Sequence, residues 1–284
     1  MAEGLALVFM LGAGQGLFLS LLLVTHRDAS RDGKAFLALL ALVLSAALLD
    51  YCLDISGLSS RQTWLRVLLW PKEYFYGPCI YLYVCTLVGR LSGNRARHFG
   101  LVALHIALSW PMLLLPPSQQ WAVMFSEPLD SEWLTLWSDA LVVLDDWLPI
   151  VHISAYLALS LRQLKHHRQR VEQQFSYLHN VSLMWLQRLL MGLSGVYALY
   201  MLWSLVAALP VLMAWFAWVD YALGLSITLL IYTMGYLALR QPAVFMPPSE
   251  ERQIDVEINA NKSMVLVQSD VEPDSSTDEP VQLT

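Results

Sequence analysis

The chain has 284 residues, of which 57% are hydrophobic and only 14% are charged, and its mean hydropathy is +0.50. A soluble domain is about half apolar and about a quarter charged, so this composition excludes a soluble enzyme, a disordered protein and a secreted disulfide scaffold. The formal net charge is −6, and residues 249–284 account for it with nine acidic and two basic side chains. The rest of the chain is a nearly neutral, apolar body, and its three cysteines cannot all pair with one another.

Seven apolar stretches are long enough to cross a bilayer as helices, because a helix rises about 1.5 Å per residue and the hydrocarbon core is about 30 Å thick. Residues 36–44 are apolar at every position, whereas the strands of a membrane barrel alternate. We therefore expect an all-α, polytopic membrane protein with one seven-helix transmembrane domain over residues 1–246. The seven expected spans are residues 5–25, 35–55, 67–89, 99–116, 138–161, 182–209 and 213–238.

Basic side chains are concentrated in the loops after the first, third and fifth spans, which indicates that these loops are cytoplasmic. The loop 116–139 on the opposite side has four acidic side chains and no basic one. We therefore expect the N-terminus outside and the C-terminus in the cytoplasm, with residues 247–284 forming an acidic, disordered cytoplasmic tail. The ten bases of the cytoplasmic loops are Arg27, Arg31, Lys34, Arg90, Arg95, Arg97, Arg162, Lys165, Arg168 and Arg170.

Most of the tryptophans lie in or near the outer loops and the outer ends of the spans. One interpretation is an interfacial aromatic belt, which membrane proteins commonly have. The other is a lid or mouth for a small apolar or ring-shaped ligand that arrives from outside. The residues concerned are Trp64, Trp70, Trp121, Trp133, Trp137, Trp203, Trp215 and Trp218.

Carboxylates inside the expected spans indicate a polar site, because an ionisable group in the bilayer is costly unless it is paired or faces a cavity. Pro71 and Pro78 also predict a kinked or broken third span with free carbonyl groups. One hypothesis is a ligand-binding pocket in the outer half of the bundle, and the other is simple pairing of the acids with Lys72 and Arg66. The acids of the predicted pocket are Asp50, Glu73, Asp145, Asp146 and Asp220.

Two histidines, His105 and His152, lie at comparable depth in the fourth and fifth spans. Such a pair could bind haem or, with an acid, a metal ion. Without a second His pair or a cysteine ligand, hydrogen-bonded histidines in the core are the favoured interpretation, and we expect no cofactor. The sequence also has no HExxH, GxSxG, Walker or CxxC motif, so we do not expect an enzyme.

The basic segment 161–170 follows the fifth span and contains neither Gly nor Pro. It is therefore predicted to continue that span as a helix into the cytoplasm, where anionic head groups attract each base by about 1 kcal/mol. One role for this segment, which includes Arg168, is signalling. The other is only to fix the orientation of the chain in the membrane.

Residues 175–186 read Phe-Ser-Tyr-Leu-His-Asn-Val-Ser-Leu-Met-Trp-Leu. This segment resembles the inner-loop-to-helix motif of membrane-anchored AraC-type transcriptional regulators, which have Phe-Ser, a Glu, and then a small polar residue, Leu, any residue and Trp-Leu. Phe175 and Trp185 match that motif, and His179 stands where Glu is usual. Residues 12–19, 77–83 and 239–245 resemble other parts of the same multi-span domain.

In that family the multi-span sensory domain precedes a cytoplasmic helix-turn-helix module. Here 39 residues follow Phe245, with nine acidic and two basic side chains, and their net charge is opposite to what a DNA-binding face needs. The resemblance therefore implies a sensory protein of the bacterial inner membrane that does not bind nucleic acid itself. It would pass a ligand or membrane signal to a cytoplasmic regulatory protein through Arg168, Phe175, His179 and Trp185. The alternative is a small-solute transporter or channel that uses the same intramembrane carboxylates.

Overall fold

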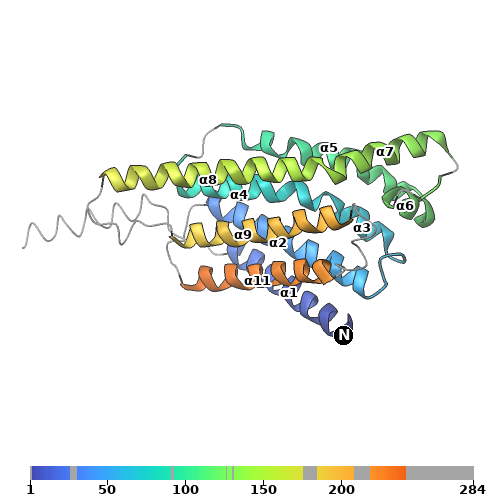
Figure 1. Cartoon of the computed structure of the whole chain (residues 1–284), viewed down its shortest axis with the longest axis horizontal. Helices are drawn as coiled ribbons and strands as arrows, with labels where there is room; N and C mark the ends of the chain where they lie inside the picture. The colour runs from blue at the N-terminus through green and yellow to red at the C-terminus, as the bar shows by residue number, and fades with distance from the viewer. Residues whose placement is uncertain are drawn as a thin grey trace, which may run out of the picture.

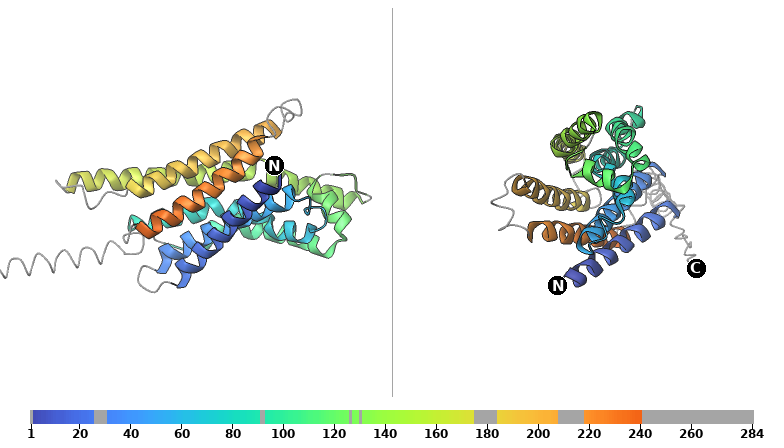
Figure 2. Two further views of the ribbon diagram at one scale, coloured as in Figure 1. Left: turned by 90° about the horizontal axis from the view of Figure 1, so that it is seen from below. Right: turned by 90° about the vertical axis from the view of Figure 1, so that its right-hand side faces the viewer.

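The computed structural model describes residues 2–25, 31–90, 93–125, 127–129, 131–174, 184–207 and 218–240. Within these ranges every regular element is a helix and no strand occurs. The longer helices run roughly along one axis and form an elongated bundle (Figures 1 and 2). The predicted all-α fold is therefore confirmed for the described part of the chain, and the expected tail 247–284 lies outside it.

Three of the described helices are long and apolar enough to cross a membrane. They are α1 (Ala2–Thr25), α2 (Arg31–Ile55) and α11 (Trp218–Arg240). Helix α9 (Met184–Ala207) contains a shorter apolar stretch, Leu186–Leu202. Each of these helices coincides with an expected span, because a long uninterrupted run of apolar residues satisfies its backbone hydrogen bonds locally in a helix.

The third expected span is divided at Pro71. Helix α3 (Thr63–Leu69) is followed directly by the 3-10 turn η1 (Trp70–Lys72) and then by α4 (Glu73–Leu87). Proline lacks a backbone N–H and its ring crowds the preceding turn, so the α-helical pattern gives way there. The predicted break occurs at Pro71, whereas Pro78 lies inside a continuous α4.

The fourth and fifth expected spans are also built from shorter pieces. The fourth comprises α5 (Gly100–Ser109) and η3 (Trp110–Leu114); η2 (Arg95–Phe99) precedes it and α6 (Pro117–Met124) follows. The fifth is divided at Trp147 into α7 (Glu132–Asp146) and α8 (Leu148–Gln174), which run end to end along one edge of the bundle (Figure 1). The predicted helical continuation through residues 161–170 is confirmed, because α8 extends four residues beyond it.

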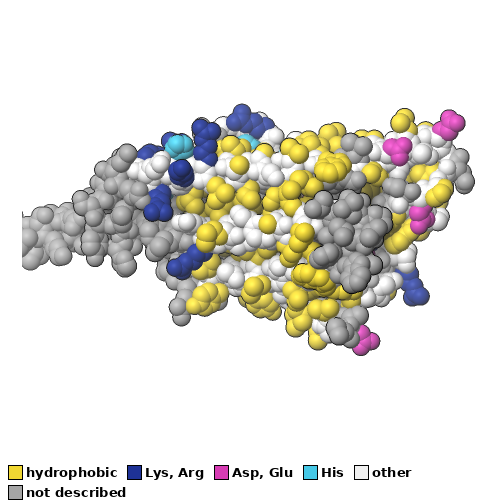
Figure 3. All heavy atoms as spheres, viewed as in Figure 1, with side chains coloured by type: hydrophobic (Ala, Val, Ile, Leu, Met, Phe, Trp, Pro, Cys, Tyr) yellow, Lys and Arg dark blue, Asp and Glu magenta, His cyan; other side chains and the backbone are white. Residues whose placement is uncertain are grey.

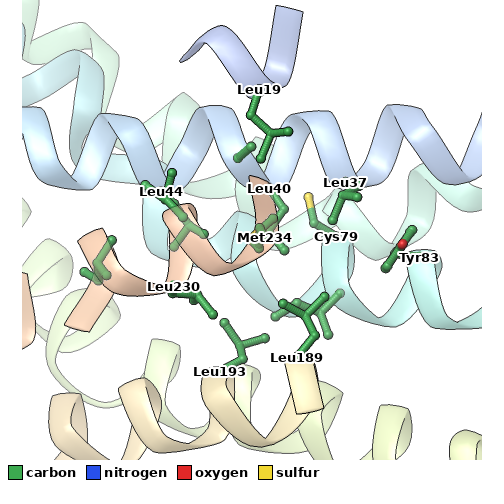
Figure 4. Close-up of a cluster of buried hydrophobic side chains, with 14 of the residues drawn as sticks. Leu19, Leu37, Leu40, Leu44, Cys79, Tyr83, Leu189, Leu193, Leu230 and Met234 are labelled. Carbon is green, nitrogen blue, oxygen red and sulfur yellow. The ribbon is translucent and has the colours of Figure 1, made fainter. Parts of the chain in front are cut away.

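The bundle is organised around α2 and α4. Helix α1 packs along α2 and α11, α4 packs between α2 and α8, and α9 packs against α11. Figure 4 shows how leucine side chains from α1, α2, α9 and α11 meet Cys79 and Tyr83 of α4 in the main core. A second, smaller cluster of Val67, Met112, Val123 and Leu141 holds α3, η3, α6 and α7 together.

Two glycines allow the closest helix contacts. A Cβ atom on Gly16 of α1 would lie 2.1 Å from Oγ of Ser45 on α2, and one on Gly224 of α11 would lie 2.5 Å from Cζ of Phe9 on α1. Small residues at such positions let helix backbones approach closely in a membrane, where packing rather than hydrophobic burial drives association.

The outer surface is apolar in the middle and charged at its two ends. Figure 3 shows hydrophobic side chains over the central part, most of the visible Lys and Arg at one end, and Asp and Glu at the other, where the N-terminus also lies. Helix α1 alone exposes about 60% of each of the side chains of Leu7, Met10, Leu11, Phe18 and Leu21. An apolar surface of this extent, bounded by charge, is typical of a protein that contacts lipid.

Candidate ligand-binding cavity

A cavity of about 90 Å³ lies between α2, α4, α8, α9 and α11. A single water molecule needs only about 10–15 Å³ by the same measure, so the cavity can hold several waters or a small organic group. Most of its wall is apolar, which is typical of small-molecule sites. The apolar lining residues are Leu44, Ala47, Ile80, Ile153, Leu157, Leu193, Val196, Leu223 and Ile227.

One end of the cavity is polar. Lys72 and Glu73 line it at the junction of η1 and α4, so the turn at Pro71 sets the direction in which both side chains leave the backbone. Four tyrosines also line the cavity, namely Tyr51, Tyr76, Tyr197 and Tyr200. The Tyr200 hydroxyl donates a hydrogen bond of 2.8 Å to Oε2 of Glu73.

Lys72 also belongs to an ion-pair network that extends from the cavity towards α3. Its Nζ atom lies 2.8 Å from Oδ2 of Asp50, and Nε of Arg66 lies 3.2 Å from Oδ1 of the same carboxylate. Arg66 also pairs with Asp54, which is more exposed. Of the two hypotheses made from the sequence, ion pairing therefore describes Asp50, whereas Glu73 faces a cavity.

The charge of the Glu73 carboxylate is balanced by different groups from those that balance Asp50. Among the described side chains no base lies within the 4 Å of an ion pair with Glu73, although Lys72 attracts it from further away. Its identified hydrogen-bond donor is the neutral Tyr200 hydroxyl. A carboxylate in a cavity lined by four tyrosines can bind a protonated amine, because the carboxylate and the faces of the aromatic rings both attract cations.

The other predicted pocket acids do not line this cavity. Asp145 pairs with His105 of α5, with Nε2 and Oδ1 2.7 Å apart. Asp220 lies in the first turn of α11 and is half-buried. Asp146 ends α7, and its side chain is outside the described part. The structure thus brings Asp50 and Glu73 together around Lys72 and places Asp145 in a separate contact.

The predicted signalling residues are described only in part. Arg168 is exposed on the last turns of α8. Phe175 and His179 lie outside the described residues, and Trp185 is described only as part of the α9 backbone. The role of this segment remains a prediction.

The two histidines that were weighed as metal or haem ligands are both buried. Nε2 of His105 contacts Asp145, and its Nδ1 lies 3.4 Å from Oγ of Ser109. His152 lies 9% exposed among aromatic rings. Within the described ranges, no group of three or more His, Cys, Asp or Glu side chains is arranged to hold a metal ion. His105 therefore fits the interpretation of a hydrogen-bonded core histidine.

Sequence reasoning did not single out the four tyrosines of the cavity. Tyr197 and Tyr200 are three residues apart and therefore lie on one face of α9. The spacing of Tyr197 and Tyr200 can be recognised in the sequence, but it does not reveal which helix packs against that face of α9.

Comparison with protein-family models, curated proteins and solved structures finds no match to this chain. Its function must accordingly be argued from the geometry of its own residues.

Proposed function

We propose that this protein is a sensor of the bacterial inner membrane that binds a small ligand in the cavity and passes the signal to a cytoplasmic regulatory protein. The observation that carries the proposal is the continuity of α8. Near one end it lines the cavity with Ile153 and Leu157, and towards its other end it bears the exposed base Arg168. Helix α8 therefore connects the cavity directly with the exposed segment that contains Arg168.

The proposed route along α8 is short. Leu157 and Arg168 are eleven residues apart, which corresponds to about 16 Å along a helix. Helix α8 packs mainly on α4, where a Cβ atom on Gly77 would lie 2.9 Å from the Tyr156 ring. A ligand that binds more tightly to the cavity when α8 is in one of two positions would shift the equilibrium towards that position. The basic segment at the other end of α8 would then move with the helix.

The chemistry of the cavity suggests the class of ligand. Nine apolar side chains favour a small apolar or ring-shaped body, and Glu73 with the surrounding tyrosines favours a protonated amine at its polar end. Lys72 offers less for an anionic ligand, because its ammonium group is already paired with Asp50.

The membrane arrangement that we propose has seven crossings, the N-terminus outside and the basic loops in the cytoplasm. The apolar exposed faces and the excess of Lys and Arg at one end of the bundle support it (Figure 3). In this arrangement Phe175, His179 and Trp185 follow the cytoplasmic end of α8, and together with Arg168 they form the proposed contact with the regulatory protein.

A site-specific cross-linking experiment tests the output. A photoreactive amino acid at position 168 should capture a cytoplasmic protein in intact cells, whereas the same group at the 42% exposed Leu159 should capture lipid only. Introducing Glu73→Gln should change the yield at position 168, because the cavity would then bind its ligand differently. Equal capture at both positions, or no capture of protein at either, would contradict the proposal.

The half-buried carboxylate of Glu73 also favours one alternative, a transporter for a small solute. Membrane transporters place such carboxylates on the solute pathway. In that case vesicles containing the purified protein should accumulate an amine-bearing solute, and Glu73→Gln should abolish uptake. Cross-linking at position 168 would then be unaffected by the same substitution.

A further inference from the structure

A second series of polar side chains lies beside the cavity but does not line it. On α4, Glu73, Tyr76 and Ile80 line the cavity. Tyr74 and Tyr81, which directly follow Glu73 and Ile80 in the chain, do not line it. Since each residue turns an α-helix by about 100°, these sets face different neighbours. The second set meets α5, α7 and α8. In order along the bundle, the series is Asp145, His105, Tyr74, His152, Tyr156 and His98.

The series begins with the close contact of Asp145 and His105. Nε2 of the imidazole and Oδ1 of the carboxylate are 2.7 Å apart, and His105 is only 1% exposed. The Tyr74 ring lies 5.2 Å from the His105 ring, centroid to centroid. The Tyr74 hydroxyl donates a hydrogen bond to the carbonyl of Leu144, the residue before Asp145. Carboxylate, imidazole and phenol are thus grouped at the junction of α4, α5 and α7.

His152 continues the series on α8. Its ring centroid lies 5.7 Å from that of Tyr74 and 4.8 Å from that of Tyr156. Its Nδ1 atom is buried and has no hydrogen-bond partner among the described residues. A buried polar atom without a partner is costly, so its presence in a ring that packs between two tyrosines calls for an explanation.

The series ends at the partly exposed His98 of η2. Nδ1 of His98 lies 3.0 Å from the Tyr156 hydroxyl oxygen, and the Tyr81 ring lies 5.5 Å from the His98 ring. Burial and then the neighbouring Arg97 lower the pKa of His98, so it is neutral at neutral pH and able to accept a proton. Asp145 at the other end retains 21% of its side-chain exposure. Both ends are therefore more accessible than His105 and Tyr74 between them.

We propose that this series of side chains conducts protons through the bundle between Asp145 and His98. Histidine and tyrosine suit this role, because an imidazole has one nitrogen to accept and one to donate, and a phenol can accept one proton while donating another. The two end contacts, Asp145–His105 and Tyr156–His98, are already at hydrogen-bond distance. The three steps between them join packed rings and require small side-chain rotations or a bridging water.

The proposed transfer moves one proton at a time and changes no oxidation state. A proton enters at Asp145, is handed from His105 through Tyr74, His152 and Tyr156, and leaves from His98. Each imidazole accepts a proton at one nitrogen and releases one from the other, and each phenol accepts one proton and releases another. Rotation of the ring or hydroxyl group then restores the initial tautomer or orientation. The net result is one proton and one positive charge moved from the acidic end to the basic end, or the reverse, as the gradient directs. The path does not depend on the proposed ligand or on a cytoplasmic partner.

Vesicles containing the full chain and the internal pH dye pyranine test the proposal. A potassium gradient with valinomycin supplies the potential that drives protons inward. The protein should acidify the vesicles faster than protein-free vesicles do. His152→Phe should lower the protein-dependent rate about a hundredfold, the effect expected for loss of a positioned acid–base group. The matched control is His166→Phe, which removes an exposed histidine from the same helix and should leave the rate unchanged.

Two further variants keep the test decisive if His152→Phe fails to fold. Tyr156→Phe removes only the hydroxyl group that contacts His98, and His98→Gln acts at the partly exposed end. Both should lose proton conduction while keeping the thermal unfolding temperature of a folded protein. Wild-type vesicles that acidify no faster than protein-free vesicles would overturn the proposal, as would folded Tyr156→Phe and His98→Gln proteins that conduct at the wild-type rate.

Discussion

The hydroxyl group of Tyr200 donates a hydrogen bond of 2.8 Å to the carboxylate of Glu73, and this contact joins α9 to the first residue of α4. The two residues are 127 positions apart in the chain. The contact orients the carboxylate at the polar end of the cavity, while the nearby Lys72 is held by Asp50.

Tyr200→Phe should destabilise the protein by about 1.5–3 kcal/mol, because a hydrogen bond to a charged group is lost in a partly buried site. Unfolding in mixed micelles with increasing SDS measures the change. The control is Tyr232→Phe on α11, which removes a hydroxyl from a side chain that is 46% exposed. If the Glu73–Tyr200 contact is responsible, Tyr200→Phe should cost much less in a Glu73→Gln background.

Asp50→Asn should cost more stability than Asp54→Asn. Asp50 is 15% exposed and lies between Lys72 and Arg66, so its loss leaves two bases without their shared acid, at an expected cost of about 3–5 kcal/mol. Asp54 is 44% exposed and pairs with Arg66 alone, so its replacement should cost under about 1 kcal/mol. The same unfolding experiment compares the two variants. Equal effects would show that Asp50 is not the centre of the network.

Gly16→Ala should weaken the packing of α1 on α2 by about 1–3 kcal/mol, because its Cβ atom would overlap Ser45. Gly14→Ala on the same helix is the matched control, since nothing lies within 4 Å of the atom that it adds. That control should be neutral or slightly stabilising, because alanine favours helix more than glycine does. The unfolding temperatures of the two purified variants in detergent test this difference.

The proposed orientation predicts opposite labelling of two exposed positions. A membrane-impermeant thiol reagent added to intact spheroplasts should modify Glu132→Cys but not Arg168→Cys, and lysed membranes should react at both. The native Cys52, Cys79 and Cys85 are buried and should contribute little background. Labelling of Arg168→Cys in intact spheroplasts would place the basic end outside.

The lowered pKa of His98 predicts a stability change in mild acid. The folded protein favours neutral His98, so this contribution is complete above the ordinary histidine pKa of about 6.5 and is lost as the pH falls through the lower folded value. The unfolding temperature of the wild type should therefore fall more between pH 7 and pH 5 than that of His98→Gln. Parallel pH profiles for the two proteins would show that His98 makes no such contribution.

The helices could be predicted closely from the sequence, because apolar length and the absence of helix breakers are local properties. The expected first span, residues 5–25, corresponds to α1 at Ala2–Thr25, and the helical extension beyond residue 161 also occurs. The break at Trp147 was not predicted, although Pro149, in the first turn of α8, was an available signal, because proline is tolerated in the first turn of a helix but not in its interior. The break at Pro71 was predicted, because proline disrupts a helix through its own geometry.

The sequence by itself determined an apolar helical protein with its bases and acids segregated, because composition and loop charges do not depend on how helices are rotated. Only the tertiary structure decided that Glu73 faces the cavity while its neighbour Tyr74 faces His105 and His152. Adjacent residues on a helix point about 100° apart, and the packing of α4 between α2 and α8 selects the direction of each. Rotation about the helix axis is a property of the packed bundle, and the segment 73–87 alone carries no record of it.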